Sequence, residues 1–163
     1  MMIKKPLYLP VLPKNFAMAS APRGIHHINF VVRDLDAAEA RYRALLGLGP
    51  AIRDPLPGRG VLTARFRIGE SWLVLVQPLG EDGEPARHLR EHGEGFFLLS
   101  FEVDSLESAV ADATAAGARF TADAPRSGLE DWQVIDFDPA DTFGAQLQLT
   151  ESGAGSGRSG ENS

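Results

Sequence analysis

An internal repeat restricts the fold of this chain more than any other feature of its sequence. The segment His27–Leu35 lines up with Leu98–Leu106, about 71 residues later. Identical residues recur at matching positions: Phe30/Phe101, Val32/Val103, Leu35/Leu106, Ala38/Ala109 and Ala40/Ala111. Each copy shows an alternating strand pattern, then a polar residue suited to capping a helix, then a helical apolar stripe. A duplicated unit of this length predicts two modules that share a core and a pseudo-twofold axis.

Composition excludes several classes of protein. The net charge of −6 argues against a nucleic-acid partner, because phosphate neutralisation needs clustered Lys and Arg. The chain has no cysteine, which rules out disulfides, thiolate metal ligands and a cysteine nucleophile, and fits the cytoplasmic location that we expect. No apolar run approaches the roughly 20 residues that span a bilayer, so we expect no membrane partner.

The two ends differ from the middle of the chain. Residues 1–22 have an apolar stretch interrupted by prolines, which predicts an extended arm that packs on the domain or on a partner subunit. Residues 152–163 are rich in Gly and Ser and predict a disordered tail. A single domain is expected over residues 23–151, since a chain of this length can bury one sizeable core.

Secondary-structure signals follow the same order in both halves of the domain. The first module, about 24–78, predicts a strand at 25–33, a helix at 35–46 and strands at 49–54, 61–68 and 72–77. A linker at 79–95 contains a short helix around 86–92. The second module, about 96–151, predicts a strand at 96–104, a helix at 106–116 and strands at 118–123, 131–137 and 144–150. The pattern is βαβββ twice, an α+β fold.

Two βαβββ units resemble the vicinal oxygen chelate superfamily, which includes glyoxalase I, methylmalonyl-CoA epimerase, extradiol dioxygenases and bleomycin-resistance proteins. The resemblance covers residues 24–151 and is closest to the epimerase and glyoxalase branch. Its motifs lie in the segments His26–Val32, Trp72–Leu79, His92–Gly95 and Asp138–Leu149. It implies an eight-stranded, U-shaped mixed sheet with helices on the convex face. It also implies a homodimer.

Metal-dependent members of that superfamily hold one divalent ion with four side chains from the concave face of the sheet. The resemblance places these four positions at His27, Val74, Leu98 and Gln148. Val74 and Leu98 have no lone pair to donate, and metal affinity depends on the number and type of ligands. We therefore predict that the protein has no catalytic metal and needs no other cofactor.

Strand parity predicts a cavity on the concave face, with His27 and Gln148 as catalytic residues. An apolar centre with a few convergent polar groups suits a small organic ligand, and arginines at the rim suit a carboxylate or phosphate. The predicted substrate-binding residues are Asn29, Arg65, Arg67, Trp72, Val74, Leu98, Ser100, Glu102 and Gln146.

Structural roles remain open for most of these residues. Arg65 and Arg67 with Glu102 also fit a solvated lattice of ion pairs, and Trp72 also fits the core or a subunit interface. Asn29, Gln146 and Gln148 also fit a polar network that satisfies itself across the sheet, and His27 fits a buried relic. Strand parity points His26 to the helix side of the sheet or the strand end, and the pair His88 and His92 suits the surface.

Two functions follow from these residues and the resemblance. In the first, the protein is a metal-independent isomerase or lyase that removes a proton next to a carbonyl group. His27, with an ordinary pKa of about 6.5, is then the base, and the Gln148 and Asn29 amides stabilise the enolate. In the second, the protein binds a small molecule without transforming it, as bleomycin-resistance proteins do. A non-catalytic partner subunit is a further alternative.

Overall fold

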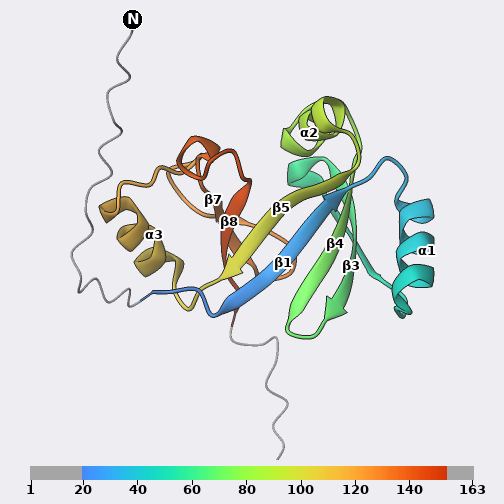
Figure 1. Cartoon of the computed structure of the whole chain (residues 1–163), viewed down its shortest axis with the longest axis horizontal. Helices are drawn as coiled ribbons and strands as arrows, with labels where there is room; N and C mark the ends of the chain where they lie inside the picture. Colours follow the sequence, from blue (N-terminus) through green and yellow to red (C-terminus); the bar gives the residue numbers. More distant parts are fainter. Residues whose placement is uncertain (1–19, 154–163) are drawn as a thin grey trace, which may run out of the picture.

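The computed structural model describes residues 20–153, so the predicted arm and tail lie largely outside the described residues. The described chain forms an eight-stranded mixed sheet that curls into a half-barrel, with three helices (Figure 1). The strands are β1 (Gly24–Val31), β2 (Ile52–Leu56), β3 (Val61–Ile68), β4 (Ser71–Pro78), β5 (Gly95–Glu102), β6 (Arg126–Ser127), β7 (Gln133–Asp136) and β8 (Leu147–Glu151). The helices are α1 (Leu35–Leu46), α2 (Glu84–His92) and α3 (Leu106–Ala115).

Strand order confirms the two modules that the repeat predicts. The order is β2-β3-β4-β1-β5-β8-β7-β6, so each module contributes four consecutive strands. The two repeat strands, β1 and β5, pair antiparallel at the centre. Each repeat strand also pairs in parallel with the last strand of its own module, β1 with β4 and β5 with β8. The α+β class and the U-shaped mixed sheet are confirmed.

Helices α1 and α3 cover the convex face, and their ends are capped as the sequence predicts. Asp34 accepts a hydrogen bond from the backbone N–H of Ala37 at 2.9 Å, and Gly47 ends α1 in the left-handed region. Ser105 caps α3 through Ser108 at 3.2 Å. The apolar stripes of the two helices complete two cores: Val32, Leu35, Ala64, Phe66 and Leu75 under α1, and Val103, Leu106, Ala109, Ile135 and Leu149 under α3.

Helix α2 has a different position. It lies beyond one end of β1 and β5, at the mouth of the cup (Figure 1). Its Leu89 packs against Val31, Phe97 and Leu98, which face the cup. The linker helix therefore closes one end of the concave side.

One predicted strand is absent. The segment 118–123 forms only an isolated bridge between Phe120 and Phe137, so the prediction of a strand there is wrong. The two-residue strand β6 pairs with β7 instead. Pro125 lies between the two segments and cannot donate a ladder hydrogen bond, which delays pairing until Arg126.

Two bulges break the alternation of the central strands. In the β1–β5 pairing, Ile25 lies opposite Phe101 but His27 lies opposite Ser100, so His26 is an extra residue on β1. Further along, Asn29 lies opposite Leu98 and Phe30 opposite Phe96, which makes Phe97 an extra residue on β5. A bulge turns consecutive side chains toward one face, and this rearrangement shapes the cup.

Candidate functional site

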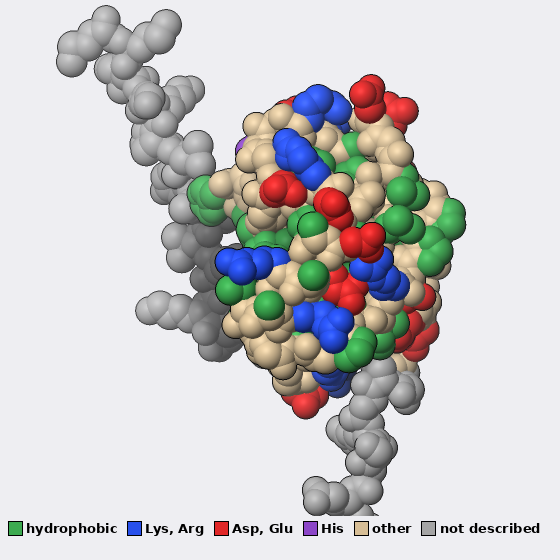
Figure 2. Space-filling view, turned by 90° about the vertical axis from the view of Figure 1, so that its right-hand side faces the viewer, with side chains coloured by type: hydrophobic (Ala, Val, Ile, Leu, Met, Phe, Trp, Pro, Cys, Tyr) green, Lys and Arg blue, Asp and Glu red, His purple; other side chains and the backbone are tan. Residues whose placement is uncertain are grey.

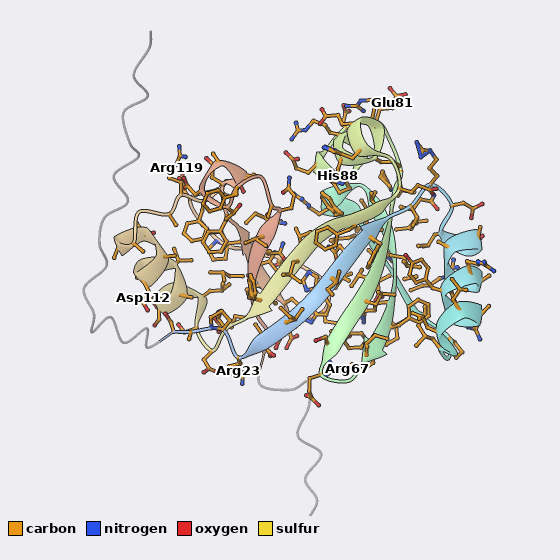
Figure 3. The ribbon with its side chains drawn as sticks, viewed as in Figure 1. Arg23, Arg67, Glu81, His88, Asp112 and Arg119 are labelled. Atoms are coloured by element: carbon orange, nitrogen blue, oxygen red, sulfur yellow. The ribbon has the colours of Figure 1, made fainter. Side chains whose placement is uncertain are left out.

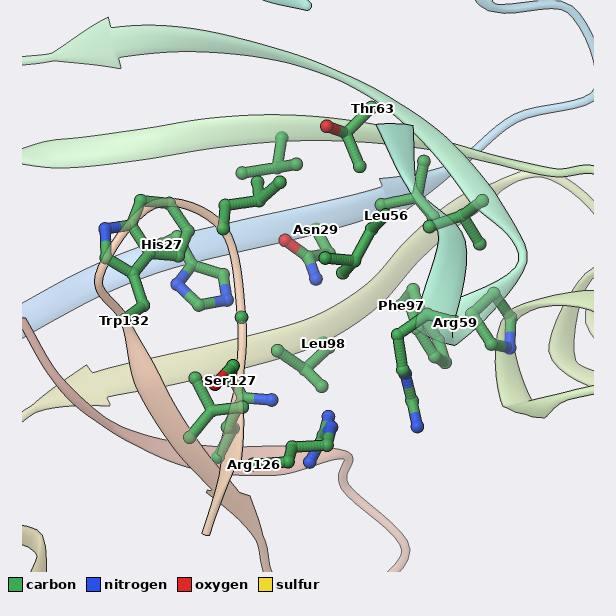
Figure 4. Close-up of a pocket in the computed structure, with 18 residues that line it drawn as sticks. His27, Asn29, Leu56, Arg59, Thr63, Phe97, Leu98, Arg126, Ser127 and Trp132 are labelled. Carbon is green, nitrogen blue, oxygen red and sulfur yellow. The ribbon is translucent and has the colours of Figure 1, made fainter. Parts of the chain in front are cut away.

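Two connected cavities occupy the cup. The inner cavity has a volume of about 80 Å³ and lies between the modules. The outer cavity, at about 520 Å³, lies beside α2. The residues that line both are Arg59, Phe97, Leu98 and Arg126. In Figure 4, His27 and Trp132 lie at one end of the inner cavity and Phe97 and Arg59 at the other.

His27 and Trp132 line the closed end of the inner cavity, the end away from the outer cavity, and His26 packs against both of their rings. His27 is only 4% exposed, and its ring stacks on Trp132 with centroids 5.1 Å apart. Because of the bulge, His26 lies on the same face, with its centroid 4.5 Å from that of Trp132. The prediction that His26 faces the helix side is therefore wrong. The two Nδ1 atoms of His26 and His27 are 2.8 Å apart, so one imidazole donates to the other.

Burial controls the charge of His27. Desolvation, followed by the nearby His26, lowers the pKa of His27 to about 3, although a side-chain hydrogen bond with Gln148 acts in the opposite direction. The imidazole is therefore neutral at pH 7, and a group with so low a pKa is a weak proton acceptor. Burial also lowers the pKa of His26.

A chain of polar contacts orients the imidazole. Arg126 donates to Oδ2 of Asp136, and Gln148 Nε2 donates to Oδ1 of the same carboxylate at 2.8 Å. A carboxylate paired with arginine only accepts, which directs the Gln148 carbonyl oxygen away from it. That oxygen accepts from the Thr150 hydroxyl at 3.5 Å. Nδ1 of His27 faces His26, so a hydrogen bond from His27 to the Gln148 oxygen would use Nε2–H, with His26 donating to Nδ1 of His27.

Asn29 supplies a free polar group to the inner cavity. Its Oδ1 atom is buried and has no hydrogen-bond partner among residues 20–153. An unpaired buried acceptor costs about 1–3 kcal/mol. A ligand that donates to this oxygen, or that accepts from the amide after rotation, would remove that cost.

The structure brings five predicted site residues into the inner cavity and places the others elsewhere. His27, Gln148, Asn29, Val74 and Leu98 line the inner cavity. Gln146 lines the outer one. Ser100 is fully buried and shares a hydrogen bond of 2.6 Å with Thr150, while Glu102 pairs with Arg23 at 3.0 Å.

Arg65, Arg67 and Trp72 line a separate hollow of about 260 Å³. Arg65 is 3% exposed, forms ion pairs with Asp54 and Glu130, and lies 5.3 Å from the ring centroid of Trp72 and 6.0 Å from that of Trp132. It thus ties β3 to the loop that carries Trp132. Figure 3 shows Arg67 at the end of the sheet opposite His88 and α2.

Arg59, Phe97, Arg126 and Trp132 are among the lining residues that sequence reasoning missed. Parity along the predicted strand 131–137 would have found Trp132, because Asp136 pairs with Gln148 and Val134 with Thr150 on the concave face. The orientation of Phe97 toward the cavity depends on a bulge in β5, which the sequence pattern did not predict. Arg59 ends the turn between β2 and β3, and Arg126 belongs to the strand that was placed too early.

The residues do not fit the divalent metal that the resemblance implies for other members. The four positions converge on the inner cavity, but two are the aliphatic side chains of Val74 and Leu98. The Nδ1 atom of His27 faces His26, and the Gln148 amide is held between Asp136 and His27. Among residues 20–153, no three His, Cys, Asp or Glu side chains cluster in a way that would hold a metal.

The surface carries both signs of charge. Figure 2 shows Lys and Arg side chains interspersed with Asp and Glu on one face of the molecule. Such a face lacks the continuous basic stripe typical of nucleic-acid binding. Within the described part of the chain, no helix is both long enough and apolar enough to span a membrane.

Comparison with known proteins finds a matching family model and relatives that are named as epimerases. A family model for the glyoxalase/bleomycin resistance protein/dioxygenase superfamily matches residues 26–135. Human mitochondrial methylmalonyl-CoA epimerase is 29% identical over 129 residues, which cover 78% of this chain and 73% of that protein. The ethylmalonyl-CoA/methylmalonyl-CoA epimerase of Cereibacter sphaeroides is 28% identical over 129 residues, covering 78% of this chain and 96% of that protein.

Solved structures show the same similarity. A variant of Streptomyces coelicolor methylmalonyl-CoA epimerase, in complex with 2-nitronate-propionyl-CoA, superposes with a TM-score of 0.78 and 29% identity. The match covers 82% of this chain and 100% of that chain.

Proposed function

Because the chain belongs to the glyoxalase/bleomycin resistance protein/dioxygenase superfamily, we propose that it is a metal-independent, epimerase-like enzyme. It acts on a small organic molecule with a carbonyl group, by isomerase- or lyase-type proton transfer in the inner cavity. Relatives named as acyl-CoA epimerases support a thioester as the carbonyl compound.

The observation that carries this proposal is a neutral imidazole at the closed end of an apolar cavity. We assign the proton of His27 to Nε2, because Nδ1 faces His26, and a ligand carbonyl can accept a hydrogen bond from that Nε2–H. When the carbon next to the carbonyl loses its proton, negative charge develops on the carbonyl oxygen. A preoriented donor in a water-poor site stabilises that charge and typically contributes a factor of 10² to 10³.

In this proposal His27 is the hydrogen-bond donor, because its pKa of about 3 makes it a weak base. Asn29 can provide a second hydrogen bond from its amide. No carboxylate lines the inner cavity among residues 20–153, so in this proposal the proton passes to Glu91 or His92 of the outer cavity and returns from there to the carbanion to complete the isomerisation. The carbonyl oxygen thus points inward and the reacting C–H bond outward.

Two substitutions separate the donor role from the base role that the sequence predicted. His27→Gln keeps a donor but loses the imidazole, and His27→Leu loses both. For a donor, solvent-deuterium exchange into short acyl thioesters, measured by mass spectrometry, should stay within about tenfold in the Gln variant and fall by about 10² to 10³ in the Leu variant. Equal losses of about 10² or more in both variants would restore the base role.

Binding without turnover is the second candidate. The lack of a proton acceptor in the described lining of the inner cavity favours it. A ligand that occupies the cavity, shown by a change in Trp132 fluorescence, and yet exchanges no deuterium would establish binding alone. Assembly as a homodimer, the cytoplasmic location and the independence from cofactors stay predictions.

A further inference from the structure

Two arginines stand at the junction of the cavities. Arg59 comes from the turn between β2 and β3, and Arg126 comes from β6 in the other module. Both line the inner and the outer cavity. A ligand that extends from one cavity into the other therefore passes between two guanidinium groups (Figure 4).

The charges at this junction do not balance. Asp136 is the carboxylate that pairs with Arg126, and its second oxygen accepts from Gln148. Arg59 is half-buried and has neither an ion pair nor a side-chain hydrogen bond with any residue in 20–153. Of the charged groups that act on Arg59, one carboxylate, Asp136, therefore faces two guanidinium groups. The outer cavity is also lined by Glu91 and by the ion pair of Arg87 with Glu84.

The pKa of Arg59 reflects the same neighbouring charges. Burial lowers the pKa of Arg59, and repulsion by Arg126 lowers it further, while Asp136 raises it. An arginine that is partly desolvated and faces another arginine gains from any anion placed between them, because weak screening strengthens the attraction.

We infer that Arg59 and Arg126 bind the oxyanion group of the ligand, a carboxylate or a phosphate, whose uncharged part fills the inner cavity. Guanidinium groups offer paired N–H donors that match both anions. The inference rests on the proposed site but does not require turnover. It moves the anion from Arg65 and Arg67, where sequence parity had placed it, to a pair that parity did not identify.

The volume of the inner cavity limits the size of the uncharged part of the ligand. A water-sized group needs about 10–15 Å³ of cavity volume, so a cavity of about 80 Å³ accepts on the order of five to eight non-hydrogen atoms. The inner part of the ligand is then a short carbonyl-containing chain. The oxyanion lies at its outer end, and any larger portion continues into the outer cavity.

Arg59 is the residue to change, because it has no side-chain partner within residues 20–153 to lose. Removing Arg126 would instead leave Asp136 without its ion pair. Arg59→Gln removes the charge, and Arg59→Lys keeps it without the paired donors. Arg87→Gln is the matched control, since Arg87 lines only the outer cavity and pairs with the exposed Glu84.

The test is a titration of the full chain with butyrate, with its neutral analogue butyramide, and with propyl phosphate, followed by Trp fluorescence. Butyrate or propyl phosphate should bind at least tenfold more tightly than butyramide, and salt should weaken that binding. Arg59→Gln should lose roughly ten- to a hundredfold in affinity for the preferred anion, Arg59→Lys less, and Arg87→Gln little.

The preferred anion identifies the source of the oxyanion, carboxylate or phosphate ester. Equal binding of butyrate, propyl phosphate and butyramide would overturn the inference, as would unchanged anion affinity in Arg59→Gln with an unchanged melting temperature. Loss of deuterium exchange with anion binding intact would overturn the proposed enzyme but leave the anion site standing.

Discussion

The two faces of the sheet are both buried, but they are built from different side chains. Under α1 and α3, the buried residues of the convex face are all apolar, from Leu75 in one module to Ile135 in the other. The concave face contains every buried polar or charged residue of the described chain: His26, His27, Thr63, Arg65, Ser100, Gln148 and Thr150. In this sheet, the convex face contributes mainly to stability, and the concave face carries the candidate site.

The difference follows from what covers each face. Helices α1 and α3 bring their own apolar stripes to the convex side, which needs no polar partners. The concave side is covered by a loop and one helix end, so its polar groups must satisfy one another. Most do, through pairs such as Ser100 with Thr150 and Gln148 with Asp136. Two atoms do not, Asn29 Oδ1 and Arg65 Nε, and of these two residues Asn29 lines the inner cavity.

The largest expected effect concerns the convex core. Leu75 is fully buried there, so Leu75→Ala should lower the free energy of unfolding by about 2–5 kcal/mol. Its neighbour Val74 faces the inner cavity, and Val74→Ala should cost less, because it removes fewer carbons beside space that already exists. Urea denaturation of both variants measures the difference. An equal or larger loss for Val74→Ala would contradict the division by face.

An effect of comparable size, about 3.5 kcal/mol between pH 6.5 and pH 4, is expected from pH, and it belongs to the concave face. The pKa of His27 is about 3 in the folded protein and 6.5 in an unperturbed chain, so between these values only the unfolded chain binds the proton. Stability from this group is complete above pH 6.5 and decreases by about 1.4 kcal/mol per pH unit as the pH falls toward 3. His26 acts in the same direction.

The check is urea denaturation of the wild type and His27→Gln between pH 7 and pH 4. Carboxylates titrate in both proteins, so the difference in slope isolates the histidine. Parallel curves would mean that His27 titrates normally and is not desolvated.

The smallest effect on stability should come from replacing Asn29, and the same substitution should have a large effect on ligand binding. Asn29→Leu removes an unsatisfied buried oxygen while keeping a similar shape, so the free energy of unfolding should stay within about 0.5 kcal/mol or rise. Ligand binding or deuterium exchange should fall about tenfold or more, since a hydrogen-bonding group is lost. A large loss of stability would show that Asn29 has a structural partner after all.

Local signals predicted most of the fold correctly. The repeat, the helix caps at Asp34 and Ser105 and the alternation along β3 depend on residues close in sequence. Pairing across the sheet then follows from which face is apolar. The failure at 118–123 lies where short, weakly apolar strands depend on their partners rather than on their own pattern.

The candidate site was predicted only in part, and the reason differs by residue. His27, Gln148, Val74 and Leu98 were found because the repeat and the resemblance point to their positions. Parity misplaced His26 and overlooked Phe97, because each is an extra residue at a bulge. Arg65 was predicted to bind the ligand because it lies on the concave face. Its ion-pair partners, Asp54 and Glu130, come from other segments of the chain, and strand parity cannot identify them.

By itself, the sequence determined the duplicated α+β architecture, the apolar convex core and the replacement of two ligand positions by aliphatic side chains. These properties depend on periodicity and residue type, which are local. Tertiary structure alone decided that His27 is neutral, that Arg65 forms ion pairs, and that Arg59 has no side-chain partner within residues 20–153. Those properties depend on burial and on contacts between modules, because desolvation and pairing arise only where distant segments meet.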